Sequence, residues 1–269
     1  MTTVSSRDIL VLVIYGFPLI AGNDKEAMVD LSERQQALLK AIVEEYIESA
    51  EPIGSEVIER KYNLGVSPAT IRIEMAKLTE NGYLRQPHTS AGRTPTSMGM
   101  RFYIDQLMKE KQLPITAEVS IKEKMWQQRY KQERLIKEAV SALAQRLDMV
   151  GLAVDDEGQL FYAGCANILD WPEFYDIDVT RFVLSLFDEN PRLKEIMGKA
   201  VGSDPIHILF GEDMEFEYLR PCSFVFTKYD VKSEKTGVIG VIGPARMNFP
   251  LVLPYVKYVR DLLNEAIRV

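Results

Sequence analysis

The stretch SPATIRIEMAKLTENGYLRQPHTSAGRTPT, residues 67–96, opens with the signals that begin a helix. Ser67 is a residue type whose side chain caps free backbone N–H groups. Pro68 suits the first helical position, because its missing N–H needs no partner there. The apolar residues that then recur at helical spacing are Ile71, Met75 and Leu78. This spacing predicts an amphipathic helix with one buried face.

A short basic hairpin is predicted directly after this helix. Asn81 and Gly82 are residue types that end helices because they tolerate a left-handed backbone. Residues 83–86 predict a short strand, residues 87–92 a loop, and Arg93 the start of the returning strand. A capped helix followed by a basic hairpin is typical of a winged helix-turn-helix, in which the helix reads DNA and the hairpin is the wing.

The alternative is an ordinary helix with a surface hairpin, and three features favour DNA binding over it. The helix begins with small and hydroxyl residues that allow close approach to DNA, the loop contains one apolar residue, Ala91, and two further helices precede the motif. The candidate DNA-contacting residues are Ser67, Ala69, Thr70, Arg72, Ile73, Lys77, Arg85, His88, Thr89, Ser90, Arg93 and Thr94.

The two preceding helices are predicted within residues 31–64. Ser32 and Gln35 have the spacing of a capping box, and apolar residues then follow a helical period. Pro52 ends this helix, and a shorter helix begins near Gly54. The predicted core of this small domain consists of Leu38, Ile42, Ile58, Ile71, Leu78 and Leu84.

The charge of the chain is divided unevenly along its length. The formal net charge is −7, which is unusual for a protein that binds nucleic acid. Residues 65–111 nevertheless carry seven basic and four acidic side chains, whereas residues 148–269 carry 12 basic and 20 acidic ones. Positive charge therefore collects where DNA phosphates require it, and the acidic remainder should limit non-specific binding.

Cysteine and histidine are too scarce for a zinc cage or a disulfide framework. Cys165 and Cys222 are the only cysteines of the chain, and His88 and His207 are its only histidines. We therefore expect two buried, inert thiols, no metal and no cofactor, and a reducing compartment such as the cytoplasm.

Residues 1–30 do not continue the pattern of the rest and are predicted to be an extension of unclear role. The apolar run at residues 9–21 is shorter than the ~20 residues that a spanning helix needs. It lacks a convincing signal-peptidase site, and Met28 stands just before the first capped helix. We expect residues 1–27 to be dispensable, with a membrane-tethered regulator as the remaining alternative.

The remainder of the chain predicts an α+β multidomain protein. Residues 31–108 form the winged helix-turn-helix, and residues 109–148 a helical linker or dimerisation segment whose apolar stripe is too irregular to assign by heptads. In residues 149–269 we expect hairpins at 150–164 and 223–242, a strand at 207–210 and two helices. Such an antiparallel sheet flanked by helices is typical of a small sensor domain.

Five stretches of the sequence resemble the HrcA-type heat-inducible transcription repressors of bacteria. They are EPIGSEVI (51–58), SPATIR (67–72), GYLRQPHTSAGRTPT (82–96), NILDWPEF (167–174) and IGPARMN (242–248). The resemblance implies a dimeric repressor of chaperone genes with a winged-helix head and a GAF-like effector domain that contains an inserted dimerisation module. It further implies binding to an inverted-repeat operator on double-stranded DNA, modulation by a GroEL-type chaperonin, and no membrane partner.

Some features of the chain depart from the family's pattern. Ile73 stands where the family usually has Asn, and Met100 where it usually has Tyr. One predicted hairpin separates the linker from residues 167–174, so the effector domain is expected to be shorter than the family's. This shortening leaves open whether the dimerisation module is retained.

The alternative function is a regulator gated by a small molecule in the GAF-like domain. Residues 243–246 could line the pocket, with Arg246 pairing an anion, although a structural ion pair is the favoured explanation of Arg246. An enzyme is disfavoured, since we find no catalytic triad, phosphate loop or metal-ligand cluster. The acidic residues at 155–157 are better explained as a solvated turn.

Overall fold

The computed structural model describes residues 30–62, 64–188, 191, 193, 195–196, 205–214, 216–231 and 235–268. The described residues from Glu33 onward belong to one compact unit. The predicted extension of residues 1–30 therefore lies outside the described residues, except for Asp30.

The segment Glu33 to Leu107, called the head below, contains helices and one small hairpin. Its elements in chain order are α2 (Glu33–Ser49), α3 (Ser55–Lys61), α4 (Pro68–Glu80), β1 (Leu84–Arg85), β2 (Thr94–Pro95), α5 (Ser97–Phe102) and the π-helix η2 (Tyr103–Leu107). Strands β1 and β2 pair antiparallel. The core residues predicted from the sequence, Leu38, Ile42, Ile58, Ile71, Leu78 and Leu84, are all buried.

The predicted helix signals act as expected in the head. The Ser67 hydroxyl accepts a hydrogen bond from the Thr70 N–H at 3.3 Å, and α4 begins at Pro68. Gly82 adopts a φ of +80°, the left-handed conformation that ends the helix and turns the chain into β1. Thr96 caps α5 by accepting from the Gly99 N–H at 3.1 Å. Short-range chemistry therefore sets the boundaries of this segment.

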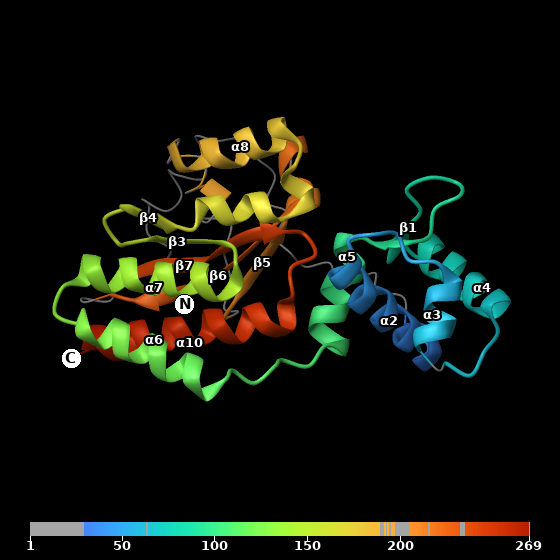
Figure 1. Ribbon diagram of the computed structural model, residues 1–269, viewed down its shortest axis with the longest axis horizontal. Helices are drawn as coiled ribbons and strands as arrows, with labels where there is room; N and C mark the ends of the chain where they lie inside the picture. The colour runs from blue at the N-terminus through green and yellow to red at the C-terminus, as the bar shows by residue number, and fades with distance from the viewer. Residues whose placement is uncertain are drawn as a thin grey trace, which may run out of the picture. The chain divides into compact units, whose positions relative to one another are not determined.

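The second part of the chain is built on a five-stranded antiparallel sheet with the order β4-β3-β7-β6-β5 (Figure 1). Its strands are β3 (Val150–Val154), β4 (Leu160–Ala163), β5 (His207–Phe210), β6 (Cys222–Asp230) and β7 (Thr236–Pro244). The two hairpins and the strand expected from the sequence are confirmed, and β6 and β7 pair along their full length, from Cys222 with Pro244 to Asp230 with Thr236.

Helices cover both faces of this sheet (Figure 1). α7 (Gln132–Leu147) and α10 (Phe249–Arg268) lie against one face, and α6 (Ile115–Gln127) packs on both of these helices. α8 (Ile177–Asp188) lies on the other face, with the 3-10 segments η3 (Cys165–Asp170) and η4 (Pro172–Phe174) beside it. Burial on both faces explains why nearly every residue of β6 and β7 is buried.

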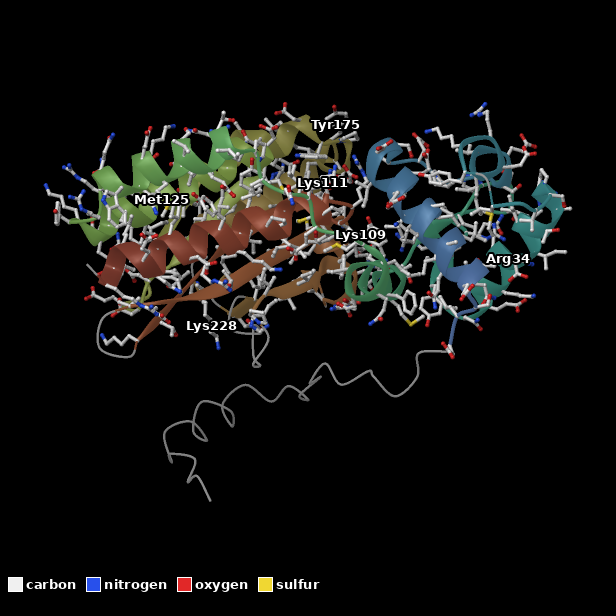
Figure 2. The ribbon with its side chains drawn as sticks, turned by 90° about the horizontal axis from the view of Figure 1, so that it is seen from below. Arg34, Lys109, Lys111, Met125, Tyr175 and Lys228 are labelled. Atoms are coloured by element: carbon white, nitrogen blue, oxygen red, sulfur yellow. The ribbon has the colours of Figure 1, made fainter. Side chains whose placement is uncertain are left out.

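The segment predicted as a helical linker, residues 109–148, contains two helices rather than one. A turn at residues 128–131 separates α6 from α7, and the Arg129 guanidinium stacks over Tyr130 with 4.1 Å between its carbon and the ring centre. The apolar stripe of this segment is buried within the chain's own fold, and Figure 2 shows Met125 on α6 beside α10. The assignment of residues 109–148 to dimerisation stays a prediction.

Candidate nucleic-acid interface

The face of α4 opposite the core presents small, basic and apolar side chains together. Ala69, Arg72, Ile73 and Lys77 are exposed on it, and Thr70 is half-buried. Ile73 has 58% of its surface exposed, although it is a large apolar residue. Ala69, Arg72, Ile73 and Lys77 are therefore accessible from solvent, whereas Thr70 is only partly so.

Polar contacts hold the basic residues of α4 in place. The Arg72 Nη2 lies 3.4 Å from the hydroxyl of Ser55, at the start of α3. The Lys77 ammonium donates to the Glu74 carboxylate at 2.9 Å, and Gln35 of α2 donates to the same carboxylate at 3.0 Å. The hydrogen bond from Lys77 lowers the pKa of Glu74, with a smaller contribution from Gln35. Glu74 thus orients Lys77 and links α4 to α2.

The base of the hairpin is joined to the segment between α2 and α3. Ile53 and Arg93 exchange two backbone hydrogen bonds, of 2.8 and 2.9 Å. A Cβ atom on Gly92 would come closer than 3.0 Å to three backbone atoms of Ile53. Glycine is therefore required here for close approach of two backbone segments rather than for an unusual φ.

The tip of the hairpin is organised by one amide side chain. Gln86 donates to the carbonyl oxygens of Thr89 and Ala91, at 2.8 and 3.0 Å. His88 and Ser90 are 3.2 Å apart, between Nδ1 and Oγ, and both are exposed together with Thr89. The loop therefore presents its polar side chains to solvent on a fixed backbone.

Two predicted contact residues of the hairpin serve structural roles. Thr94 is only 5% exposed, and its hydroxyl accepts from the Arg85 Nε at 3.3 Å. Its burial argues against direct DNA contact and for positioning of Arg85. Arg93 is half-buried and donates from Nε to the Thr79 hydroxyl at 3.0 Å, so that it links the hairpin to α4.

Arg85 also contacts an acidic turn of the sheet domain. Its Nη1 lies 2.5 Å from the Glu212 carboxylate, in the 3-10 turn η5 (Gly211–Asp213). The same carboxylate accepts from the Ser97 N–H at 3.1 Å. The neighbouring Asp213 accepts from the Ser97 hydroxyl at 2.7 Å and from Arg101 at 2.5 Å. These acidic partners could not be identified from the sequence, because more than 100 residues separate them from the hairpin.

Arg246 is surrounded by protein groups. It is 6% exposed, pairs with both oxygens of Glu173, donates to the Ile47 carbonyl at 2.6 Å and lies over the Trp171 ring. This arrangement is the structural ion pair favoured from the sequence. An anion-binding role for Arg246 stays a prediction that none of its described contacts supports.

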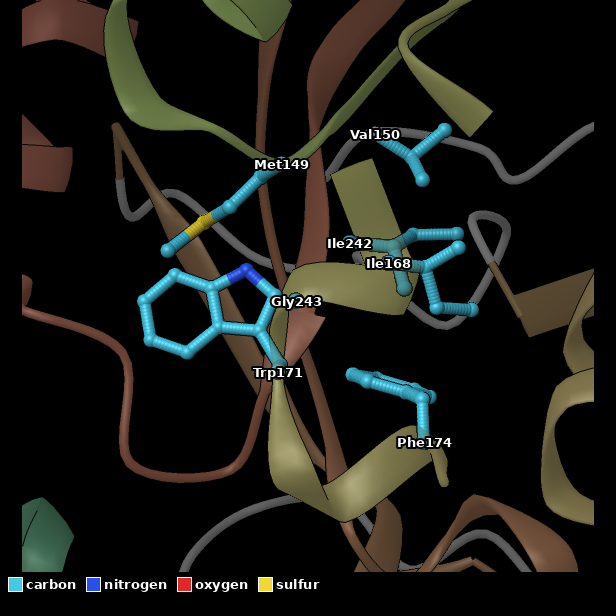
Figure 3. A pocket seen from close by; sticks show the side chains of 7 residues that line it. All are labelled: Met149, Val150, Ile168, Trp171, Phe174, Ile242 and Gly243. Carbon is cyan, nitrogen blue, oxygen red and sulfur yellow. The ribbon is translucent and has the colours of Figure 1, made fainter. Parts of the chain in front are cut away.

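Two hollows of the sheet domain bear on a small-molecule site. Figure 3 shows the residues that line the first, Met149, Val150, Ile168, Trp171, Phe174, Ile242 and Gly243. No space large enough for a water molecule remains between them. The second is an open hollow of about 330 Å³ beside the acidic turn at residues 155–157. Arg246 lines neither of these two hollows, whereas Gly243, another residue of the predicted 243–246 pocket, lines the first.

The thiols and carboxylates show no metal site within the described part of the chain. Cys165 and Cys222 are both free, and burial raises the pKa of each thiol. Cys222 is buried, whereas Cys165 is only half-buried, so the prediction of two buried thiols is wrong for Cys165.

Among the helices that the structure describes, none has the length and apolar character to cross a bilayer.

Comparison with known families decides where the chain belongs. The family model of the HrcA protein C-terminal domain matches residues 96–253, which is more than half of the chain. The chain belongs to the HrcA family. The match covers all five strands of the sheet domain, so membership in the HrcA family does not depend on the hairpin stretch at residues 82–96.

Individual relatives agree with this assignment to the HrcA family. The "Heat-inducible transcription repressor HrcA" of Symbiobacterium thermophilum is 28% identical over 340 aligned positions, covering 88% of this chain and 99% of the relative. The protein of the same name from Desulforamulus reducens is 29% identical over 337 positions, covering 88% and 97%. Because these alignments exceed the 269 residues of the chain, both relatives contain residues without a counterpart in it.

A solved structure shares the fold. The crystal structure of a hypothetical protein superimposes with a TM-score of 0.73 at 20% sequence identity, covering 88% of this chain and 99% of that one. This similarity concerns the arrangement of helices and strands alone.

Proposed function

We propose that this member of the HrcA family is a transcription repressor that binds operator DNA through a winged helix-turn-helix, with α4 as recognition helix and residues 84–95 as wing. The observation that carries the proposal is the exposed face of α4, with Arg72, Ile73 and Lys77, in a head whose hairpin is bound to the segment between α2 and α3 through Ile53. The relatives named as heat-inducible transcription repressors support the same function.

The chemistry of the two elements suits different parts of DNA. An α-helix fits the major groove, where an exposed Arg72 has the donors to read a guanine edge. The hairpin presents Arg85, His88, Thr89 and Ser90, whose side chains can donate hydrogen bonds to phosphate groups. Contacts to phosphates position the protein and carry no sequence information. The acidic sheet domain disfavours close approach to DNA elsewhere on the molecule.

The proposed repressor acts as a dimer on an inverted repeat. Two-fold symmetric half-sites match a two-fold protein, and one small head alone would bind weakly. A stable dimer needs an interface of roughly 1,600 Å², which we place in the GAF-like sheet domain and in residues 109–148. Its targets are chaperone genes, and a GroEL-type chaperonin modulates its activity.

The proposal is tested by titrating the protein on its own upstream DNA and on a scrambled duplex. Arg72→Ala should weaken operator binding and reduce the preference for operator over scrambled DNA. Arg93→Ala should weaken both duplexes alike, since it removes a charge and loosens the hairpin. Arg181→Ala, which removes a charge from an exposed pair on α8, is the matched control.

Equal loss of preference in both head variants would contradict this division of roles. Absence of operator binding by the unaltered protein, with and without chaperonin, would contradict the proposed function itself.

A further inference from the structure

Ile73 is an apolar side chain in a position that packing does not explain. The core face of α4 is formed by Ile71, Met75 and Leu78, all buried, whereas Ile73 is 58% exposed. Isolated exposed apolar residues are common on protein surfaces and need no explanation by themselves. The position of Ile73 on the proposed recognition helix is what gives its exposure meaning.

Ile73 extends an apolar strip along the exposed face of α4. Ala69 precedes it by four residues and is also exposed, so their side chains lie on the same face. The rise between them is about 6 Å along the helix axis, at about 1.5 Å per residue. This length is close to two base-pair steps of about 3.4 Å.

The basic neighbours of this strip are held beside it. Lys77 is bonded to Glu74 at 2.9 Å, and Arg72 lies 3.4 Å from Ser55. Neither contact covers Ile73, which keeps more than half of its surface free. The exposed face of α4 therefore has the apolar side chains of Ala69 and Ile73 between the hydrogen-bond donors of Arg72 and Lys77.

We infer that Ile73 determines sequence specificity by contacting the C5-methyl group of a thymine in the operator half-site. This inference rests on the proposed function. The side chain of Ile73 has no hydrogen-bond donor or acceptor, so it cannot pair with a base edge. The thymine methyl is the apolar group that base pairs display in the major groove, and apolar side chains contact it there. Ala69 has room for the same contact about two base pairs away.

The inference is tested on the full chain with thymine-to-uracil replacements, which remove the C5-methyl group and leave every hydrogen-bonding atom in place. Half-sites are first selected from randomised duplexes. Each thymine is then replaced singly by deoxyuridine, and Kd is measured by fluorescence anisotropy for the unaltered protein and for Ile73→Ala. Ile73→Val, which keeps the branched apolar end, is the conservative variant.

We expect one thymine position in the half-site at which a single deoxyuridine replacement raises the Kd of the unaltered protein about fourfold, the effect of losing one buried methyl group. In Ile73→Ala the same replacement should change Kd less than twofold, because the contact is already lost, while Ile73→Val should retain most of the effect. Ile177→Ala, at a site 64% exposed on α8, should behave as the unaltered protein.

Uracil replacement that is harmless at every position, or equally harmful in Ile73→Ala, would overturn the inference while leaving DNA binding intact. If Ile73→Ala instead changes the oligomeric state and leaves the selected motif unchanged, this face binds protein and the inference is wrong. Failure of the unaltered protein to enrich any motif would overturn the proposed function first, so the two failures are distinguishable.

Discussion

The contact between Gly92 and Ile53 gives a prediction that separates the position of the hairpin from its charge. Alanine at position 92 adds one methyl group and leaves every charged residue of the head in place. That methyl would overlap backbone atoms of Ile53, at distances below 3.0 Å that real Cβ atoms essentially never show. Because the obstacle is backbone, rotation of a side chain cannot relieve the overlap, and the hairpin must move away.

The expected size of the effect follows from what this movement breaks. Ile53 and Arg93 exchange two backbone hydrogen bonds, and each contributes about 0.5–1.5 kcal/mol net. Loss of both destabilises the head by about 1–3 kcal/mol, and the gain in backbone stiffness from Gly92→Ala offsets less than about 1 kcal/mol of this. DNA affinity should fall at least about tenfold as the hairpin is displaced, since one charge-assisted hydrogen bond contributes about 1.5–3 kcal/mol.

Urea unfolding and anisotropy titration on operator DNA measure both quantities for Gly92→Ala. Gly54→Ala is the matched control, because nothing lies within 4 Å of its added Cβ and its φ of −87° is open to alanine. Unchanged stability and DNA affinity in Gly92→Ala would refute the claim that the Ile53 contact positions the hairpin. A loss of equal size in Gly54→Ala would show that the segment responds to any added methyl group.

Two further predictions concern the acidic turn and the thiols. Glu212→Gln should release Arg85 and strengthen operator binding about two- to fivefold at low salt, because this partly exposed ion pair contributes at most about 1 kcal/mol. Anisotropy titrations measure the change, with Glu265→Gln, which loses an exposed pair with Lys122, as the control. Unchanged binding in Glu212→Gln would contradict this reasoning. Burial raises the pKa of Cys165 and Cys222, so little thiolate is present at pH 7 and a thiol reagent should react slowly with both, faster as pH rises. The half-buried Cys165 should react first. Mass spectrometry measures the order of labelling, and labelling of Cys222 before Cys165 would contradict the prediction.

Features set by neighbouring residues were predictable from the sequence. Ser67 and Thr96 cap the helices that follow them, and the spacing of apolar residues identified the buried face of α4. The long pairing of β6 with β7 was visible as two apolar strands around a polar turn. In each case the partners lie within a few residues or in adjacent strands, where local propensity and burial agree.

Features set by distant partners were not predictable. The sequence marks Thr94 as a polar residue of the returning strand and a candidate DNA contact, and only the pairing of β1 with β2 reveals its burial and its hydrogen bond to Arg85. The break between α6 and α7 follows from their packing on α10 and not from a proline or glycine. Arg85 and Glu212 are 127 positions apart, so their pairing needs the folded chain.

In the proposed complex with DNA, the Glu212 carboxylate competes with a DNA phosphate for the Arg85 guanidinium. The Arg85 Nη1 hydrogen that is donated to Glu212 cannot be donated to a phosphate at the same time. Because both residues belong to one chain, the fold sets the effective concentration of the carboxylate near Arg85. Added salt screens the internal pair as well as the attraction to DNA. If Arg85 contacts a phosphate as proposed, we expect its release from Glu212 to offset part of the affinity that screening removes. The salt slope of DNA binding should then be shallower than the number of phosphate contacts alone would give.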